Sequence, residues 1–314
     1  MAVIQVDGLH KAFGDVQAVR GVSFHVDQGE VLAVLGPNGA GKTTTVEILE
    51  GFQDRDGGDV SVLGMDPAHG GSRMRERIGI VLQECEADPY LTVSELLRKH
   101  SQYYPRPRSV DEVIGLVGLD HKAGNRVKTL SGGQKRRLDV ALGLVGDPEL
   151  LFLDEPTTGF DPSARRQAWE IVRSMGALGK TVLLTTHYMD EAQALADRVV
   201  VITAGRIVAE GTPESIGGRA DADARIDFRP PIGVLPTELP VAVEPLDDGL
   251  VRHVTATPTD ALRRLTSWAA DHGGELAGLA VTRPSLEDVY LELTAAPLDA
   301  TEATDATAAE QDVP

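Results

Sequence analysis

Residues Gly36 to Thr43 combine residue types and spacing that suit binding of a nucleoside triphosphate. Their sequence, GPNGAGKT, places two glycines separated by four residues ahead of Lys and Thr, which is the phosphate-loop pattern. Glycines let the backbone turn through left-handed conformations and aim N–H groups at phosphate oxygens. Lys42 would reach the β- and γ-phosphates, and the Thr43 hydroxyl would ligate Mg²⁺. A plain glycine-rich turn is disfavoured, because a strand-like run precedes the loop and a helix-like run follows it.

Two adjacent carboxylates follow an apolar run later in the chain. Residues 150–153 read Leu-Leu-Phe-Leu, as in a central parallel strand, and Asp154 and Glu155 come next. Ligands of open α/β sheets bind at the carboxyl ends of such strands. Asp154 would hold Mg²⁺ through water, and Glu155 would orient or deprotonate the attacking water. The alternative is a polar strand end in contact with solvent, which is disfavoured because a phosphate loop needs an acid beside its Mg²⁺.

Three other features stay open on spacing alone. Phe13 precedes a glycine upstream of the phosphate loop, so it could stack on a nucleotide base or pack into a core at a strand end. Ser131, Gly132 and Gly133 open a predicted helix, which suits an anion, although in isolation the pattern favours an ordinary helix cap with a tight turn. His187 ends a strand-like run, where a lone histidine is usually structural, although its place beside the other sites favours a functional role.

The remaining pattern supplies the elements that must position these side chains. Strand-like runs alternate with helix-like runs, which predicts an α/β domain with a largely parallel core sheet. Thr92 is expected to cap a helix over residues 92–104. The basic residues Lys135, Arg136 and Arg137 are expected to form a solvated helix face rather than a nucleic-acid patch. Strands are predicted as short runs at 4–6, 22–26, 30–35, 60–63, 78–82, 150–155, 181–186, 199–202 and 207–209, and helices at 44–50, 111–119, 132–144 and 164–175.

Length, charge and cysteine content narrow the class of protein. The chain has 314 residues and a net charge of −18, so it is long enough for about two domains and its acidity disfavours nucleic acid as a partner. The single cysteine allows no internal disulfide and fits a reducing compartment. We expect no signal peptide and no membrane-spanning segment.

Taken in order, these motifs resemble those of the nucleotide-binding subunit of an ATP-binding-cassette (ABC) transporter, from about residue 4 to residue 217. The resemblance also rests on Gln83 and on the string Leu-Ser-Gly-Gly-Gln at residues 130–134. Residues 157–162, 185–192, 205–208 and 285–294 are similar to exporter ATPases of the daunorubicin-resistance and multidrug (ABC-2) type. That family implies a P-loop NTPase core with an antiparallel β subdomain and a helical subdomain.

The resemblance also implies roles for individual residues. Phe13 would stack on adenine, Gln83 would contact Mg²⁺ and the attacking water, and His187 would contact the γ-phosphate. The family pairs two such domains head to tail, so that the signature loop of one closes over ATP bound by the other. The implied catalytic residues are Glu155, His187 and Gln83, and the implied Mg²⁺ contacts are Thr43, Gln83 and Asp154. The implied ATP contacts are Phe13, Gly36, Pro37, Asn38, Gly39, Ala40, Gly41, Lys42, Thr43, Thr44, Ser131, Gly132, Gly133, Gln134 and Asp161.

The implied domain organisation has three parts. Residues 1–218 would be the ABC ATPase domain, with its helical subdomain over about residues 84–145. Residues 219–294 alternate strand-like and helix-like runs without a catalytic constellation, so we predict a small α+β accessory domain, its last helix capped by Ser285 with Asp288. Residues 295–314 are rich in Ala, Thr, Asp and Glu and are predicted to be a disordered acidic tail.

The sequence therefore predicts an ATPase that uses ATP and Mg²⁺, pairs as a dimer and powers export of a drug-like or other hydrophobic substrate. It would work peripherally on the cytoplasmic face of the membrane with a separate ABC-2 type permease. A soluble ABC ATPase acting on ribosomes or DNA is the competing class. It is disfavoured because the chain has one phosphate loop, one signature and no heptad run between them. An unrelated phosphate-loop kinase or GTPase would lack the signature string. The transported substrate and the permease cannot be identified, and importers share the catalytic motifs.

Overall fold

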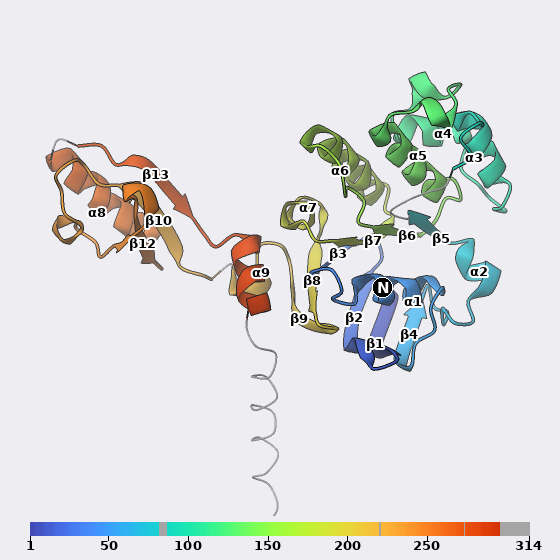
Figure 1. Ribbon diagram of the computed structural model, residues 1–314, viewed down its shortest axis with the longest axis horizontal. Helices are drawn as coiled ribbons and strands as arrows, with labels where there is room; N and C mark the ends of the chain where they lie inside the picture. Colours follow the sequence, from blue (N-terminus) through green and yellow to red (C-terminus); the bar gives the residue numbers. More distant parts are fainter. Residues whose placement is uncertain (82–86, 220, 273, 296–314) are drawn as a thin grey trace, which may run out of the picture. The chain divides into compact units, whose positions relative to one another are not determined.

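The computed structural model describes residues 1–81, 87–219, 221–272 and 274–295 (Figure 1). The chain divides into two compact units, of which the first ends at Pro213 and the second begins at Glu214. The predicted domain ranges, with their boundary at residue 218, stay predictions. Most of the predicted tail, residues 296–314, lies outside the described residues.

A mostly parallel sheet forms the centre of the first unit. Among the described residues its strand order is β5-β6-β7-β3-β8-β9. All neighbours are parallel except β8 and β9, which form an antiparallel hairpin. Strands β3 and β7 are buried at every position, as expected for apolar strands covered on both faces. The α/β core that the sequence predicts is confirmed. The strands are β3 (Val31–Leu35), β5 (Ile78–Val81), β6 (Leu150–Asp154), β7 (Thr181–Thr186), β8 (Arg198–Thr203) and β9 (Arg206–Gly211).

An antiparallel sheet of order β2-β1-β4 lies beside this core. The prediction of short strands was wrong here, because β1 (Ala2–Phe13) and β2 (Val16–Asp27) each run for 12 residues, while β4 spans Gly57–Val62. Register shifts between β1 and β2 break the regular alternation of buried and exposed positions. Bulges of this kind hide a long strand from a search for strict period two.

Helix α1 (Lys42–Glu50), which follows the phosphate loop, contacts strands of both sheets. Its buried side chains join one core with residues of β1, β2, β3, β4, β6, β7 and β8. The other helices of this unit are α2 (Gly71–Arg75), α3 (Val93–Ser101), α4 (Val110–Leu116), α5 (Gly132–Leu144), α6 (Pro162–Ala177) and α7 (Met189–Leu195), with short 3₁₀ turns at Asp120–Lys122 and Val127–Thr129.

Helices α3, α4 and α5 contact one another and form a group apart from the antiparallel sheet (Figure 1). Helix α3 begins with the predicted cap: the Thr92 hydroxyl accepts from the Glu95 amide at 3.2 Å, and the Thr92 amide donates to the Glu95 carboxylate at 2.9 Å. This reciprocal pair satisfies amides that a helix start leaves unpaired.

The second unit has its own antiparallel sheet, of order β11-β12-β10-β13 in the described residues. Ile226 and Phe228 of β10 pack with Leu265 of α8 in a separate core. The predicted cap at Ser285 is present, because its hydroxyl accepts from the Asp288 amide at 3.0 Å. The elements are β10 (Ala224–Arg229), β11 (Glu244–Pro245), β12 (Val251–Thr255), α8 (Pro258–Asp271), β13 (Ala277–Thr282) and α9 (Leu286–Ala295), with 3₁₀ turns at Ile216–Gly218, Pro236–Glu238 and Asp247–Gly249.

No helix in the described ranges has both the length and the apolar character needed to cross a lipid bilayer.

Candidate ATP-binding and hydrolysis site

The phosphate loop connects β3 to α1, and its glycines are required by the backbone. Gly41 has φ 100° and caps α1, a left-handed conformation that favours glycine. A Cβ at Gly36 would lie 2.3 Å from the carbonyl oxygen of Ile202, and one at Gly41 would lie 2.3 Å from that of Ala18. The loop therefore sits against β2 and β8 at a distance that only glycine permits.

Lys42 lies at the start of α1 and is 5% exposed. Its ammonium donates to the carbonyl oxygens of Gly36 at 2.8 Å and Pro37 at 3.1 Å, and it lies 3.9 Å from Oε1 of Glu155. The side chain thus curls over its own loop toward the carboxylate at the end of β6. This places a cation where the loop amides gather phosphate oxygens.

The end of β6 brings both predicted carboxylates to the loop. Glu155 has φ 42°, a left-handed conformation that costs a non-glycine residue about 1–3 kcal/mol. Its Oε2 accepts from the Thr158 hydroxyl at 3.0 Å, and its Oε1 lies 3.1 Å from Nδ1 of His187. Because an ionised carboxylate can only accept, the His187 proton in this contact lies on Nδ1. Glu155 is therefore fixed from two sides.

A cavity of about 450 Å³ is lined by most of the predicted site residues that belong to the phosphate loop or contact it. Phe13 lines it and is 48% exposed, so the alternative of a core phenylalanine is excluded. Its lining residues are Phe13, Ala18, Asn38, Gly39, Gly41, Lys42, Thr43, Thr44, Asp154 and Glu155. Gln83 lies outside the described residues.

Burial shapes the charges around this cavity. Desolvation lowers the pKa of the Lys42 ammonium, while the carboxylates of Glu155 and Asp154 oppose that shift. Glu50, on the last turn of α1, is 5% exposed, and burial raises the pKa of its carboxyl to about 8, with Asp154 and Glu47 adding to the effect. Glu50 is absent from the predicted site residues, because nothing in the neighbouring sequence marks it as buried.

The signature string opens α5 and forms a different cavity. The Ser131 hydroxyl accepts from the Gln134 amide at 3.4 Å, and the Ser131 amide donates to the Gln134 side chain at 3.1 Å. Asp161 caps α6 by accepting from the amides of Ser163 at 2.8 Å and Ala164 at 2.9 Å. Ser131, Gly132, Gly133, Gln134 and Asp161 all line this cavity, of about 650 Å³.

Within the described ranges, no residue lines both cavities. The structure therefore brings Phe13, the loop, Asp154 and Glu155 together in one place, with His187 joined to them through Glu155. It brings the signature residues and Asp161 together in another. The predicted ATP contacts fall into two sets within one chain.

The prediction that Lys135, Arg136 and Arg137 form a solvated helix face was wrong for Arg136, which is only 7% exposed. Its Nε donates to the carbonyl oxygen of Pro156 at 3.0 Å and its Nη2 to that of Asp154 at 3.2 Å. The signature helix is thus tied to the end of β6. Three consecutive basic residues gave no signal that the middle one is buried.

The donors on the cavity wall fit a Mg²⁺ ion bound with a nucleotide. Thr43 contributes a hydroxyl and Asp154 a carboxylate, which are the hard oxygen ligands that Mg²⁺ prefers. Mg²⁺ in such sites keeps waters and takes phosphate oxygens, so few protein ligands suffice. No group of three or more His, Cys, Asp or Glu residues that could hold a metal ion occurs in the described part of the chain.

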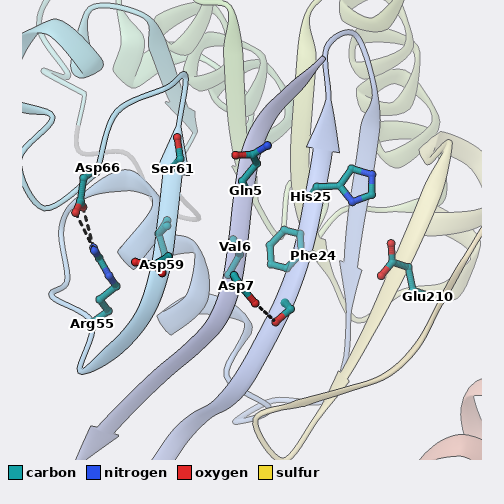
Figure 2. A pocket seen from close by; sticks show the side chains of 12 residues that line it. Gln5, Val6, Asp7, Phe24, His25, Arg55, Asp59, Ser61, Asp66 and Glu210 are labelled. Carbon is teal, nitrogen blue, oxygen red and sulfur yellow. Dashed lines mark hydrogen bonds and ion pairs between the residues drawn. The ribbon is translucent and has the colours of Figure 1, made fainter.

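Another hollow, of about 640 Å³, lies on the antiparallel sheet (Figure 2). Arg55 donates to both carboxylate oxygens of Asp66 at 2.8 Å, and these hydrogen bonds hold the pKa of Asp66 at about 2. The Ser23 hydroxyl donates to Asp7 at 3.4 Å. These polar groups are satisfied by one another, and no phosphate-loop residue lines the hollow.

Comparison with known proteins gives matches along most of the chain. A profile described as "ABC transporter" matches residues 19–158, and one described as "ABC transporter domain-containing protein-like, C-terminal domain" matches residues 224–285. The daunorubicin resistance ATP-binding protein DrrA3 of Streptomyces coeruleorubidus is 39% identical over 303 residues, which cover 93% of this chain and 95% of that protein. The Nod factor export ATP-binding protein I of Ralstonia nicotianae is 39% identical over 304 residues, covering 93% of this chain and 94% of that protein.

Solved structures agree with the fold over about two thirds of the chain. The ADP conformation of an ATP-binding cassette of an ABC transporter superposes with a TM-score of 0.61 at 26% identity, covering 68% of this chain and 92% of that one. A cassette solved as a dimer in a post-hydrolysis state, with ADP and phosphate, superposes with a TM-score of 0.59 at 22% identity, covering 67% of this chain and 98% of that one.

Proposed function

The chain belongs to the ABC transporter family as an ATP-binding, ATP-hydrolysing subunit, and from that premise we propose that it powers export of a drug-like or other hydrophobic substrate through a separate ABC-2 type permease. The curated relatives are named for daunorubicin resistance and for Nod factor export, and both alignments include the second unit. The subunit would act peripherally at the cytoplasmic face of the membrane.

One observation carries the chemistry: Glu155 is held between Thr158 and His187 on the wall of the phosphate-loop cavity. We assign Glu155 as the general base that takes a proton from the water attacking the γ-phosphate. Thr158 and His187 fix its two oxygens, so the carboxylate meets that water in a set orientation. With Nδ1 donating to Glu155, Nε2 of His187 is the ring atom directed to the γ-phosphate. General-base catalysis typically contributes about 10²–10⁴-fold.

The loop side of the site neutralises phosphate charge. The Lys42 ammonium would exchange its contacts with loop carbonyl oxygens for phosphate oxygens, and the amides at the start of α1 would donate to phosphate oxygens as well. Thr43 and Asp154 would hold Mg²⁺, which would offset the negative charge of the phosphates. Phe13, exposed at the edge of the cavity, would stack on the adenine base.

The site would be completed by a second copy. The signature residues and Asp161 line a cavity separate from that of the phosphate loop. At the start of α5, Ser131 and Gly132 are exposed. We infer a head-to-tail pair in which each ATP lies between the loop of one copy and Ser131 to Gln134 of the other. Such a pair has two equivalent sites related by twofold symmetry.

A cis and trans complementation experiment tests this arrangement. A heterodimer of one Lys42→Ala copy and one Ser131→Arg copy has one intact composite site, and should keep about half the wild-type rate if the two sites are equivalent. A heterodimer of the Lys42→Ala, Ser131→Arg double variant with a wild-type copy has no intact composite site and should be inactive. Differently tagged copies, purified in tandem, allow ATP hydrolysis to be measured for each pair. If the second pair hydrolyses ATP and the first does not, each chain completes its own site and the pairing is wrong.

The export function is tested separately in cells. Deleting the gene should raise intracellular retention of a hydrophobic fluorescent drug, and the wild-type chain but not Glu155→Gln should restore efflux. The chain should also co-purify with a polytopic membrane protein from detergent-solubilised membranes. Recovery with ribosomes, and efflux unaffected by the deletion, would contradict the proposal.

A further inference from the structure

The hydroxyl of Thr185 lies between the two carboxylate-bearing residues at the end of β6. Thr185 is fully buried on β7, and its Cα is paired in register with that of Asp154. Its Oγ1 contacts Oδ1 of Asp154 and accepts from the Glu155 amide at 3.0 Å. The family resemblance assigned no role to this residue.

The chemistry of the three groups fixes the direction of both hydrogen bonds. The Glu155 amide can only donate, so it uses a lone pair of the hydroxyl oxygen. The ionised Asp154 carboxylate can only accept, so the hydroxyl proton must point to Oδ1. Thr185 thus accepts a hydrogen bond from the Glu155 amide and donates one to the Asp154 carboxylate. Oδ2 of Asp154 keeps its lone pairs for other partners.

This contact lies where the strand must change direction. Successive side chains of a regular strand point to opposite faces, yet Asp154 and Glu155 line the same cavity. The left-handed conformation of Glu155 makes this possible, and the Glu155 amide is held there by both the hydroxyl and the carbonyl oxygen of Thr185, at 3.0 and 3.2 Å. The hydroxyl therefore supports the turn and orients the preceding carboxylate together.

We propose that Thr185 is a positioning residue for ATP hydrolysis, which acts by holding Asp154 toward Mg²⁺ and Glu155 toward the attacking water. The inference rests on the proposed roles of those two carboxylates. Mutation of a residue that hydrogen-bonds a metal ligand typically lowers activity or metal affinity by about 10–100-fold. The effect should fall on turnover and on Mg²⁺ dependence, because the loop contacts that bind ATP do not involve Thr185.

The chain offers a matched control on the same strand. Thr181 lies four residues earlier, on the same side of β7, and is also buried. Its hydroxyl accepts from the Gly29 amide at 3.0 Å, at the opposite end of the strand from the carboxylates. Thr181→Val therefore removes a similar buried hydrogen bond without touching the site.

The test compares steady-state ATP hydrolysis by the full chain and its variants over a range of ATP and Mg²⁺ concentrations. We expect Thr185→Val to lower kcat by about 10–100-fold and to raise the half-saturating Mg²⁺ concentration, with KM for ATP changed by less than about threefold. Thr185→Ser, which keeps the hydroxyl, should restore most of kcat, and Thr181→Val should retain the wild-type kcat.

The inference is overturned if Thr185→Val matches the wild type, if Thr181→Val loses as much activity, or if the serine variant fails to restore kcat. Should Thr185→Val not fold, Thr185→Ser and Thr185→Ala decide, because they differ only by the hydroxyl: equal kcat values overturn the inference, and a lower value for alanine supports it. A wild-type chain without Mg²⁺-dependent ATP hydrolysis would instead refute the proposed function, so the two failures are distinguishable.

Discussion

The phosphate-loop cavity and the signature cavity both belong to the first unit, yet they hold their polar groups by different means. In the first, Lys42, Glu155 and His187 come from three separate elements and contact one another across the sheet edge. In the second, Ser131 and Gln134 satisfy each other within one helical turn. The first depends on tertiary structure and carries buried charge. The second is a local helix cap at an exposed surface.

The largest expected effect separates chemistry from binding in the first cavity. Glu155→Gln keeps the shape and the Thr158 contact but removes the base, so kcat should fall by about 10²–10⁴-fold. Binding of ATP, measured by equilibrium dialysis, should persist, and an ATP-bound dimer should accumulate in size-exclusion chromatography. The control is Glu170→Gln, an exposed residue on α6. Hydrolysis at the normal rate by Glu155→Gln would remove Glu155 as the base.

The next effect concerns the buried carboxyl of Glu50 on α1, the helix that follows the phosphate loop. The raised pKa of Glu50, about 8 against an ordinary 4.5, means that the folded state favours the neutral acid. Stability is therefore lost as the pH rises from about 4.5 toward 8, by about 3 kcal/mol between pH 4.5 and pH 7. Glu50→Gln stays neutral and should remove that loss, as measured by urea unfolding without Mg²⁺. A parallel pH dependence in wild type and variant would show that Glu50 does not cause it.

A third effect probes the exposed edge of the same cavity. Phe13→Ala should weaken ATP binding by about 1–3 kcal/mol through lost base stacking, seen as a higher KM for ATP with kcat retained. Val16→Ala, at a 66% exposed position on the same hairpin, is the control and should leave KM unchanged. An unaltered KM in Phe13→Ala would remove Phe13 from the site.

The smallest effect on stability addresses the signature cavity. Ser131→Ala removes a capping box and should cost about 0.5–2 kcal/mol in unfolding free energy. Thr92→Ala removes the equivalent cap of α3 and should cost a similar amount. ATP hydrolysis should fall only in Ser131→Ala, with ATP binding by the isolated chain retained in both. Equal hydrolysis by the two variants would reduce the signature to an ordinary cap.

The same contrast explains what the sequence could predict. Gly36 to Thr43 and the Ser131 cap are encoded by neighbouring residues, so short motifs identify them. Asp154 and Glu155 directly follow an apolar run, and that run alone predicts their place at the end of a buried strand. The position of a core strand such as β3 was also predictable, because buried parallel strands often form continuous apolar runs.

Contacts between distant elements could not be predicted. Arg136 is a basic residue beside two others, and only the packing of α5 against the end of β6 buries it. Thr185 looks like any strand threonine until β6 is paired beside it. The full length of β1 and β2 was hidden by bulges that interrupt their alternation. Sequence motifs therefore identify the residues proposed to take part in the reaction more readily than the residues that position them.

The guanidinium of Arg136 has a consequence for the proposed pair. Its hydrogen bonds to the carbonyl oxygens of Asp154 and Pro156 tie α5, which begins at the signature residues, to the turn that carries the two carboxylates. In the proposed head-to-tail pair, α5 would contact one nucleotide and these carboxylates would contact the other. The hydrogen bonds of Arg136 would then connect the two nucleotide sites of the pair within each chain.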